Sequence, residues 1–431
     1  MGFLHSARRA GAVRTLAAAV CILLGAGSAA AAGDTTATGA QSARALVDDI
    51  AAKVSEMRRL PLLGPIEFEL VDRDHVQAFV LKTMREELPP DHVADTEQVL
   101  KLLGAIPQDT DLKQTILDLL TEQAGGIYDR RAKKLLILEH FALDRPLAKI
   151  ILAHEICHAL QDQHFDLERM PIPDPANDDL SAAAMAALEG DATILMGDYM
   201  REAMGGPSVA MAMEMMGVDQ KVLNNAPSFL RKQLLFPYLT GMEFHHRLER
   251  LHGRRARDMA LRDLPASTEQ ILHPEKYAGP DHDPPTSVTL PDLTPRLGEG
   301  WTKAFENVFG EMQIRSLFEV WRMRDVAVDA AAGWGGDSYA LYRNGDGHHF
   351  VWMSVWDTEA DAAEFADAMA RMLRTKRYRG EFHDADWETS GTARVFRRAD
   401  TAGDGLLLAV DRDRRGVGVT ITNRPDTPAA R

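Results

Sequence analysis

The sequence predicts an α+β protein, in which a mainly helical part with a short β-sheet precedes a small α+β module. Three patterns indicate this fold class. Apolar residues recur at helical spacing through much of residues 40 to 262. Two β-prone runs flank a polar turn at residues 125 to 140. Near residue 345, strand-like alternation surrounds the turn "NGDG".

The first 32 residues are predicted to be a secretory signal peptide. Arg8, Arg9 and Arg14 precede the apolar run "LAAAVCILLGAG", and "SAAAAG" supplies small residues for cleavage. The apolar run is too short to span a bilayer. We therefore expect an exported mature protein, periplasmic or secreted, with no integral membrane segment after the signal is removed.

The first part of the mature chain should consist mostly of helices. Residues 40 to 60 follow an amphipathic helical pattern, and "IEFELV" at 66 to 71 is typical of a strand. Residues 73 to 123 should be helical with breaks at "LPPDH" and "GAIPQDTD", because proline and aspartate favour turns and new helix starts.

A strand pair and two long helices should follow. "GGIYDRRAKKLLILEH" predicts the strand pair, and a helix should begin near Asp144 and Pro146 and end near Phe165. Another helix is predicted at residues 179 to 204. Residues 207 to 262 continue the helical pattern, with Pro237 as a break or kink.

A proline-rich stretch, "PASTEQILHPEKYAGPDHDPPTSVTLPDLTP", indicates the boundary between the two parts. We place one domain at residues 33 to 295 and the C-terminal module at 296 to 431. Within the module, residues 300 to 324 have a helical pattern. "SYALYRNGDGHHFVWMSVW" then predicts a hairpin, "TEADAAEFADAMARMLRTKR" a helix, and the residues after it further strands.

Charge and cysteine content restrict the partners and the means of stabilisation. The formal net charge is −15, and loss of three arginines with residues 1 to 32 takes it to −18. An acidic chain argues against nucleic acid and anionic membranes as partners. Cys157 is the one cysteine after residue 32, so the core must be stable without an internal disulfide. Its apolar surroundings favour a small buried residue over a nucleophile.

The segment "ILAHEICHALQDQHF" (151–165) carries the chemistry of a metal site. His154 and His158 are four residues apart, so on a helix both imidazoles can face one ion. Zinc accepts neutral histidine nitrogen, and a catalytic site uses three protein ligands and an open position. Glu155 is turned by about 100° from His154. It would therefore act as the general base for the attacking water rather than as a main ligand.

The third ligand should come from a later segment. His164 lies on or just after the same helix without an intervening glycine turn, so the longer HExxHxxGxxH pattern is absent. "AALEGDATILMGDYM" places Glu189 in an otherwise apolar helix, where an unpaired carboxylate would be costly to bury. We therefore predict Glu189 as the third metal ligand.

Neighbouring polar side chains should orient these ligands. Asp162 lies one turn beyond His158 and could accept a hydrogen bond from an imidazole. Asp191 is about 200° around the helix from Glu189, so we expect it to serve elsewhere. Gln161 and Gln163 are interpreted as structural.

These motifs resemble a known family. "GGIYDRRAKKLLIL", "LAHEICHALQDQHFDL" and "ALEGDAT" are similar to bacterial exported zinc metallopeptidases of the glutamate-zincin (gluzincin-like) type. The similarity extends through "LLFPYLTGMEF" and "STEQILHPEKY" to "VWDTEADAAEFADAM". The resemblance implies a zincin-like catalytic domain at residues 33 to 295, with one zinc ion bound by His154, His158 and Glu189 and with Glu155 as base.

A peptidase also needs a group that stabilises the oxyanion of the tetrahedral intermediate. Tyr238 in "FPYLTG" and His273 or Tyr277 in "STEQILHPEKY" are the candidates. Each has a structural interpretation too, as a packed aromatic residue or a histidine that anchors a loop.

The sequence therefore predicts a zinc-dependent peptidase that acts on a peptide or protein substrate. Two other functions share its residues. One is a catalytically inactive zinc-binding envelope or scaffold protein, and the other is a zinc hydrolase of non-peptide amides. The presence of Glu155 favours an enzyme. The C-terminal module is expected to bind substrate, shape the cleft or join a partner.

Overall fold

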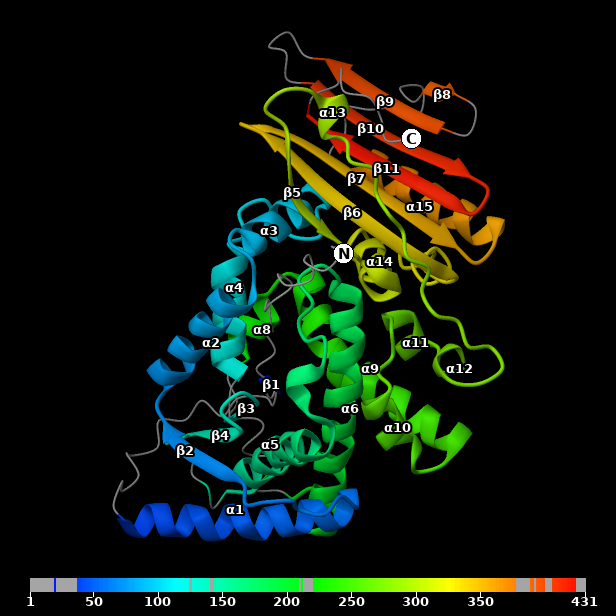
Figure 1. Ribbon diagram of the computed structural model, residues 1–431. Helices are drawn as coiled ribbons and strands as arrows, with labels where there is room; N and C mark the ends of the chain where they lie inside the picture. The colour runs from blue at the N-terminus through cyan, green and yellow to red at the C-terminus, as the bar shows by residue number, and fades with distance from the viewer. Residues whose placement is uncertain are drawn as a thin grey trace, which may run out of the picture.

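A computed structural model shows helices in the lower part of the molecule and a large sheet above them (Figure 1). The structure describes residues 19–20, 37–123, 126–139, 143, 145–208, 211, 220–376, 388–390, 393–399 and 405–423. The predicted signal peptide lies outside the described residues, except for Ala19 and Val20. The fold class is α+β, as the sequence predicts.

The lower part holds most of the helices. In chain order its elements begin with α1 (Ala37–Arg58), β2 (Glu67–Val71), α2 (Arg73–Glu87), α3 (His92–Leu103), α4 (Leu112–Gln123), β3 (Gly126–Asp129) and β4 (Lys134–Leu138). They continue with α5 (Pro146–Phe165), the short 3-10 helix η1 (Leu167–Arg169), α6 (Asp178–Glu202), α8 (Lys221–Asn225), α9 (Ser228–His252), α10 (Ala256–Arg262), α11 (Thr268–Leu272) and α12 (Pro274–Tyr277).

The local sequence explains where most of these helices begin and end. The predicted breaks separate α2, α3 and α4, and α5 begins at Pro146 and ends at Phe165. Asn177 caps α6, because its side chain accepts a hydrogen bond from the amide of Leu180. Of the two predictions at Pro237, a break or a kink, the break is wrong, since α9 runs through this residue.

A small sheet lies beside α5. Its strand order is β1-β3-β4-β2, where β1 is Ala19–Val20. β3 and β4 form the predicted antiparallel pair, and β2 runs parallel to β4. The outer edge of β3 is therefore paired with β1, two residues of the predicted signal peptide.

The helix α5 is the centre of one hydrophobic core. Residues all around it are buried, which is typical of a helix enclosed on every side. Its Leu152 and Ile156 pack in one cluster with Ile50 of α1, Leu135 of β4 and Leu188 of α6. The helix that carries both histidines is thus held from several directions.

The upper part is built around an antiparallel sheet. Its strand order is β5-β6-β7-β11-β10-β9-β8. The elements are α13 (Thr294–Leu297), β5 (Thr302–Asn307), α14 (Gly310–Val320), β6 (Trp334–Asn344), β7 (Gly347–Trp356), α15 (Glu359–Lys376), β8 (Glu388–Ser390), β9 (Ala393–Ala399), β10 (Gly405–Asp413) and β11 (Gly416–Thr422). The predicted hairpin at "NGDG" joins β6 to β7.

The helix predicted for residues 300 to 324 is only partly correct. Residues 302–307 form β5, which pairs with β6, and the helix α14 begins at Gly310. Phe305 and Asn307 are buried while Glu306 between them is less so, which is the two-residue period of a strand. The alternation covers too few residues to be recognised in the sequence next to the helical pattern that follows it.

The two parts share a second hydrophobic core. Leu100 and Leu103 of α3 pack in the same cluster as Phe305 of β5, Trp334 of β6 and Trp352 of β7. The upper sheet thus completes its core with side chains from the lower helices.

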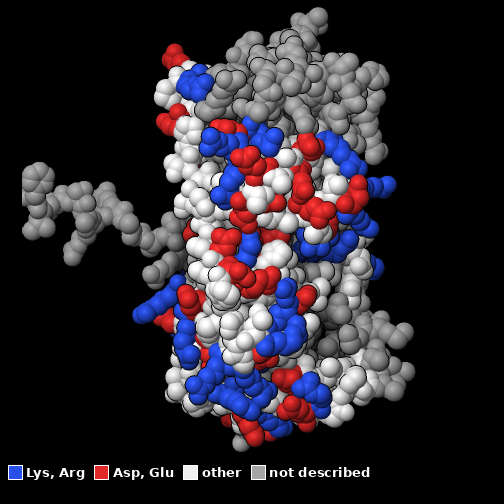
Figure 2. Space-filling model, turned by 90° about the vertical axis from the view of Figure 1, so that its right-hand side faces the viewer, with Lys and Arg blue, Asp and Glu red and all other residues white. Residues whose placement is uncertain are grey.

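Figure 2 shows the face that carries α10, α11 and α12. Lysine and arginine side chains are interspersed with aspartate and glutamate across the part of this face that is described. The net negative charge of the chain is therefore not gathered into one patch on this side.

Candidate metal centre

Helix α5 presents two imidazoles on one face, and α6 brings a carboxylate to them. His154 Nε2 and His158 Nε2 lie 3.0 Å apart. Glu189 Oε2 lies 3.0 Å from His154 Nε2 and 3.3 Å from His158 Nε2. Two ligands at about 2.0–2.1 Å from one tetrahedral zinc ion stand about 3.3 Å apart. The three atoms thus have the spacing of ligands around a single ion.

Burial disfavours the charged form of each of the three side chains, and the contacts among them partly offset this effect on their pKa values. Burial lowers the pKa of His154. Burial also opposes charge on the other two, yet the Glu189 carboxylate raises the pKa of His158 to about 9. The imidazoles, in turn, outweigh burial and lower the pKa of Glu189 to about 2.

The donor set fits a metal ion. Within the described residues, Glu189 Oε1 and His154 Nδ1 are buried and have no hydrogen-bond partner. A buried carboxylate with an unpaired oxygen is costly unless a cation compensates it. His154, His158 and Glu189 can therefore hold a metal ion.

A glutamine fixes the orientation of one imidazole. His158 Nδ1 lies 2.8 Å from Gln161 Oε1. Gln161 Nε2 donates to the Leu188 carbonyl at 3.1 Å and to Asp191 Oδ2 at 2.8 Å. Because the amide nitrogen faces two acceptors, its oxygen must face His158 and accept from Nδ1–H. In neutral His158 this leaves Nε2 unprotonated and free to bind a metal.

Two arginines hold the aspartate at the end of this chain of contacts. Arg58 Nε donates to Asp191 Oδ2 at 3.0 Å, and Arg257 Nε donates to Oδ1 at 2.6 Å. Burial opposes the charge, but the arginines keep the pKa of Asp191 well below its usual range. Asp191 was expected to serve elsewhere, yet it contacts Gln161, and Gln161 contacts His158, which can hold a metal. Gln161 thus orients His158 and is more than structural.

The expectation that Asp162 orients an imidazole is wrong. Its carboxylate accepts from the Tyr128 hydroxyl at 2.7 Å, from Lys133 Nζ at 2.7 Å and from the Leu167 amide at 2.9 Å. These partners connect α5 to the β3–β4 strand pair and to η1. The direction of the side chain, rather than its spacing along the helix, decides its role.

Glu155 lies beside the metal-ligand candidate His154 in the chain and faces the small sheet. Its side chain is buried, and a Cβ placed on Gly126 of β3 would be 3.2 Å from Glu155 Cγ. The absence of a side chain at Gly126 lets β3 approach the glutamate closely. The candidate base thus adjoins the strand on whose outer edge β1 pairs.

Of the oxyanion candidates, Tyr238 lies beside the metal ligands. Its ring centroid is 6.2 Å from that of His154, with the two planes inclined by 29°. Tyr238 and Glu189 also line the same pocket, which α4, α6 and α9 surround.

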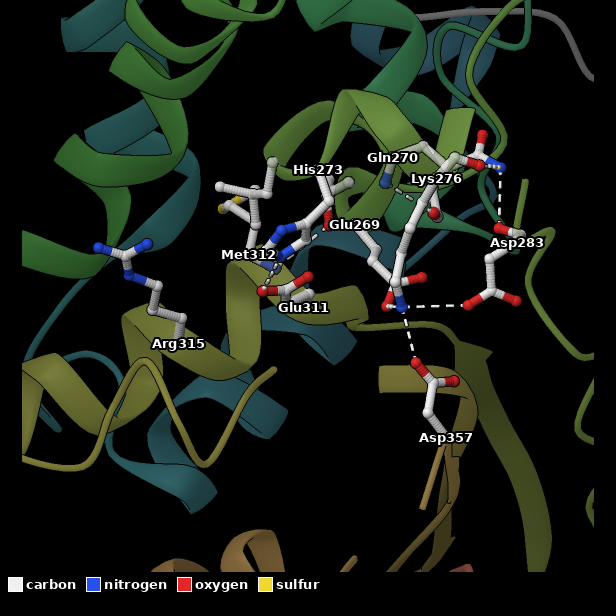
Figure 3. Close-up of polar contacts among 12 residues, drawn as sticks. Glu269, Gln270, His273, Lys276, Asp283, Glu311, Met312, Arg315 and Asp357 are labelled. Carbon is white, nitrogen blue, oxygen red and sulfur yellow. Dashed lines mark hydrogen bonds and ion pairs between the residues drawn. The ribbon is translucent and has the colours of Figure 1, made fainter. Parts of the chain in front are cut away.

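The other two candidates are engaged elsewhere. His273 Nε2 lies 3.0 Å from Glu311 Oε1, and Figure 3 shows the imidazole turned toward that carboxylate. The Tyr277 hydroxyl donates to the carbonyl of Asp263 at 2.6 Å. His273 thus links α11 to α14, and α5 lies on the other side of α6 and α9 in Figure 1. The structure therefore does not support a catalytic role for His273.

A second group of acids encloses a lysine. Glu269, Asp283 and Asp357 have carboxylate oxygens close enough to hold an ion. Lys276 Nζ already donates to them, at 2.6, 3.0 and 2.6 Å (Figure 3). The ammonium group supplies the positive charge that a metal would otherwise bring.

Cys157 is buried, and burial raises the pKa of its thiol. Both observations agree with the prediction of a small core residue. Among the described residues, no helix has the length and apolar character needed to cross a membrane.

Comparison with known proteins gives one match. A family model described as "Domain of unknown function (DUF8575)" matches residues 297–431. No curated protein and no solved structure matches the chain. The matched segment contains the upper sheet, α14 and α15, and the three metal-ligand candidates lie outside it.

Sequence reasoning missed the group formed by Arg58, Gln161, Asp191 and Arg257. The four residues lie on four different helices, α1, α5, α6 and α10, so their spacing in the sequence does not indicate that they meet. One signal was available, because Asp191 is a second acid in an apolar helix and required a buried partner.

Proposed function

We propose that the protein is a zinc-dependent peptidase, in which Glu155 is the general base for a water molecule that attacks a peptide bond. The observation that carries this proposal is the buried cluster of His154, His158 and Glu189, with Glu155 beside it on α5. The resemblance of the sequence to exported zinc metallopeptidases of the glutamate-zincin type also supports this proposal.

Each residue near the site has a task in this reaction. Zinc held by the three ligands would polarise the substrate carbonyl and lower the pKa of a water molecule to about 7. Glu155 would take the proton of the attacking water and pass it to the leaving amine. Tyr238, beside His154, is our candidate donor to the oxygen that becomes negatively charged.

The strand β3 offers a place for an extended peptide. In the structure its outer edge pairs in antiparallel fashion with Ala19 and Val20. We propose that residues 1 to 32 are a signal peptide and are removed on export. This edge would then be free to pair with a substrate strand next to Glu155.

The test begins with the metal content of the mature protein, beside Glu189→Ala and His158→Ala. We expect about one zinc ion per chain in the wild type and loss of zinc in both variants. Absence of zinc from the mildly purified wild type would end the proposal. Loss of zinc in His158→Ala alone would show that Glu189 is not the third ligand.

Glu155→Gln then separates an enzyme from a zinc-binding scaffold protein. This variant should keep its zinc but lose hydrolysis of a peptide library, since an amide cannot take up the proton. If the wild type binds zinc and cleaves no peptide, cell-wall amides should be tried next. Cleavage of those alone would favour the hydrolase of non-peptide amides.

A further inference from the structure

We infer that a groove between α9 and α14 binds a small amphipathic carboxylate, with one negative charge and a short apolar chain. We call this cavity the α9–α14 groove. It has a volume of about 260 Å³, and α9, α11 and α14 line it. The inference does not depend on the proposed function.

The α9–α14 groove is separate from the metal centre. Tyr238 of α9 lines the pocket beside the metal-ligand candidates, whereas the next residue, Leu239, lines the groove. Successive residues of a helix are turned by about 100°, which puts the two sets of lining residues on different sides of α9. An occupant of the groove thus contacts α9 of the lower part and α14 of the C-terminal module.

Much of the α9–α14 groove is apolar. Phe236 of α9 and Met312 of α14 are buried, and both line it together with Leu235 and Leu272. Leu239 lines the groove as well, although this residue is 58% exposed. An apolar chain in the groove would cover Leu239, and removing that surface from water is favourable.

Two cations and one acid are the charged residues of the groove. Lys232 of α9 and Arg315 of α14 both donate to the carboxylate of Glu319, Arg315 through Nε at 3.1 Å. Within the part of the chain that the structure describes, the two Nη atoms of Arg315 donate no hydrogen bond. Figure 3 shows its guanidinium group extending away from Glu311 and His273. The Nη atoms can therefore donate to a carboxylate of a ligand.

The net charge of these three side chains favours a monoanion. Burial opposes the charge of Glu319, but hydrogen bonds from Lys232 and Arg315 lower the pKa of this carboxyl. Glu319 therefore stays ionised at neutral pH, and the group carries one net positive charge. A carboxylate balances this charge. A phosphate monoester carries about 1.5 to 2 negative charges and exceeds it.

A buried hydroxyl group in the groove lacks a strong partner. Ser316 of α14 is buried and lines the groove. Among the described residues its hydroxyl has one contact, to the sulfur of Met312, with Oγ and Sδ 3.9 Å apart. A thioether sulfur is a weak acceptor, so the hydroxyl can donate to a ligand oxygen instead. A few polar donors beside an apolar surface are typical of a ligand site.

The volume limits the length of the ligand. Pockets of about 300–1,000 Å³ accept drug-sized molecules. The α9–α14 groove, at about 260 Å³, is smaller, so its occupant has a short chain. Octanoate combines such a chain with a carboxylate and is therefore the probe.

Calorimetric titration of the protein tests the inference. We expect octanoate to saturate one site with a dissociation constant near or below about 1 mM. Acetate lacks the chain and octylammonium has the opposite charge, so each should bind at least about tenfold more weakly. Octyl phosphate should bind no more tightly than octanoate. Treatment of the protein with a chelator should leave the octanoate constant unchanged, because no metal takes part.

A matched pair of substitutions on α9 tests the apolar part of the groove. Leu239→Ala should weaken octanoate binding by about tenfold, because the chain loses its cover. Leu251→Ala is the control, since Leu251 is 57% exposed on the same helix and does not line the groove. It should bind octanoate as the wild type does. Both side chains are exposed, so both variants should fold.

A second pair, in the C-terminal module, tests the charged part. Arg315→Gln removes the guanidinium group but keeps the pair of Lys232 and Glu319. It should weaken octanoate binding by about tenfold or more. Arg324→Gln is the control, because Arg324 is exposed and does not line the groove. It should keep the wild-type affinity.

Several results would overturn the inference. Octanoate that shows no saturation up to about 10 mM is one of them. Acetate or octylammonium that binds as tightly as octanoate, or octyl phosphate that binds more tightly, is another. Loss of octanoate binding on chelation would place the carboxylate at the metal centre. Equal affinities within either pair of variants would place the ligand outside the groove. Zinc content and hydrolysis test the proposed function separately.

Discussion

The amide of Gln161 decides which nitrogen of His158 carries a proton. Its nitrogen is committed to Asp191 and to the Leu188 carbonyl, so its oxygen must accept from His158 Nδ1. Asp191 in turn is held by Arg58 and Arg257. A chain of contacts thus leads from two buried arginines to the Nε2 lone pair of His158, a metal-ligand candidate.

We predict that Gln161→Leu lowers zinc affinity by about 10- to 100-fold, because His158 then loses the group that sets its tautomer and orientation. The matched control is Gln163→Leu on the same helix. The amide of Gln163 pairs instead with the backbone of Leu63 and Gly64. Competition with a chromophoric chelator measures both affinities, and equal values for the two variants would contradict the prediction.

Local chemistry in the sequence was enough to predict that His154, His158 and Glu189 come together, but not which groups surround them. The spacing of His154 and His158 depends only on helix geometry, and Glu189 stands out as an acid among apolar residues. Gln161 and Asp162 are neighbours of equal polarity, so their roles depend on what the fold places opposite them. Gln161 faces α6, whereas Asp162 faces the β3–β4 strand pair, and this difference in packing gives the two residues different roles.

At the scale of the elements, the contact between α6 and α9 sets the position of Glu189. The two helices approach closely at Gly190 and Gly241. A Cβ on Gly190 would overlap the backbone of Gly241, and one on Gly241 would overlap the carbonyl of Ala186. Small residues at a helix crossing allow such an approach, and Gly190 directly follows the metal-ligand candidate.

We predict that Gly190→Ala lowers the free energy of unfolding by about 1–3 kcal/mol, because α9 must move to admit the methyl group. Zinc affinity should fall as well, since the shift reaches Glu189. Gly197→Ala on the same helix is the control, because a Cβ there meets no atom within 4 Å. It should be neutral or stabilising by up to about 1 kcal/mol. Urea denaturation of the metal-free proteins gives both values, and a Gly190→Ala protein as stable as Gly197→Ala would refute the helix-contact argument.

Element limits could be predicted where turn residues mark them, and less well elsewhere. Proline and aspartate separate α2, α3 and α4 as expected. Pro237 was expected to break or kink a helix, and α9 continues through it, with Phe236 and Pro237 both buried. β5 was taken for helix because its pairing with β6 is not visible in its own residues.

At the scale of the whole molecule, a buried carboxylate holds the upper part together, and a shared core and a partly buried ion pair join it to the lower part. Asp337 of β6 accepts from the amides of Phe309 and Gly310 and from the indoles of Trp334 and Trp352. This fixes the start of α14 against the upper sheet. The proline-rich sequence predicts a boundary between two parts, but it gives no sign of this contact or of the core that α3 shares with the sheet.

Lys276 connects the two parts by ion pairs, in addition to the shared core. It lies on α12, and its ammonium donates to Glu269 and Asp283 in the lower part and to Asp357 at the end of β7. Burial opposes its charge, but the hydrogen bonds to Asp357 and Glu269 raise the pKa of Lys276 above its ordinary value. Lys276 therefore remains charged and offsets the repulsion among the acids.

We predict that Lys276→Met destabilises the protein by about 3 kcal/mol, since it leaves the buried Glu269 beside two other acids without a positive partner. Calcium should recover part of this loss in the variant and leave the wild type unchanged, because three carboxylates without the lysine form a set of oxygen ligands.

Lys303→Met is the control. Its exposed pair with Glu306 should contribute at most about 1 kcal/mol. Thermal unfolding with and without calcium measures all three proteins. Stabilisation of the wild type by calcium would mean that the ammonium does not fill the site, and equal stability of the two methionine variants would mean that the connection at Lys276 does not hold the parts together.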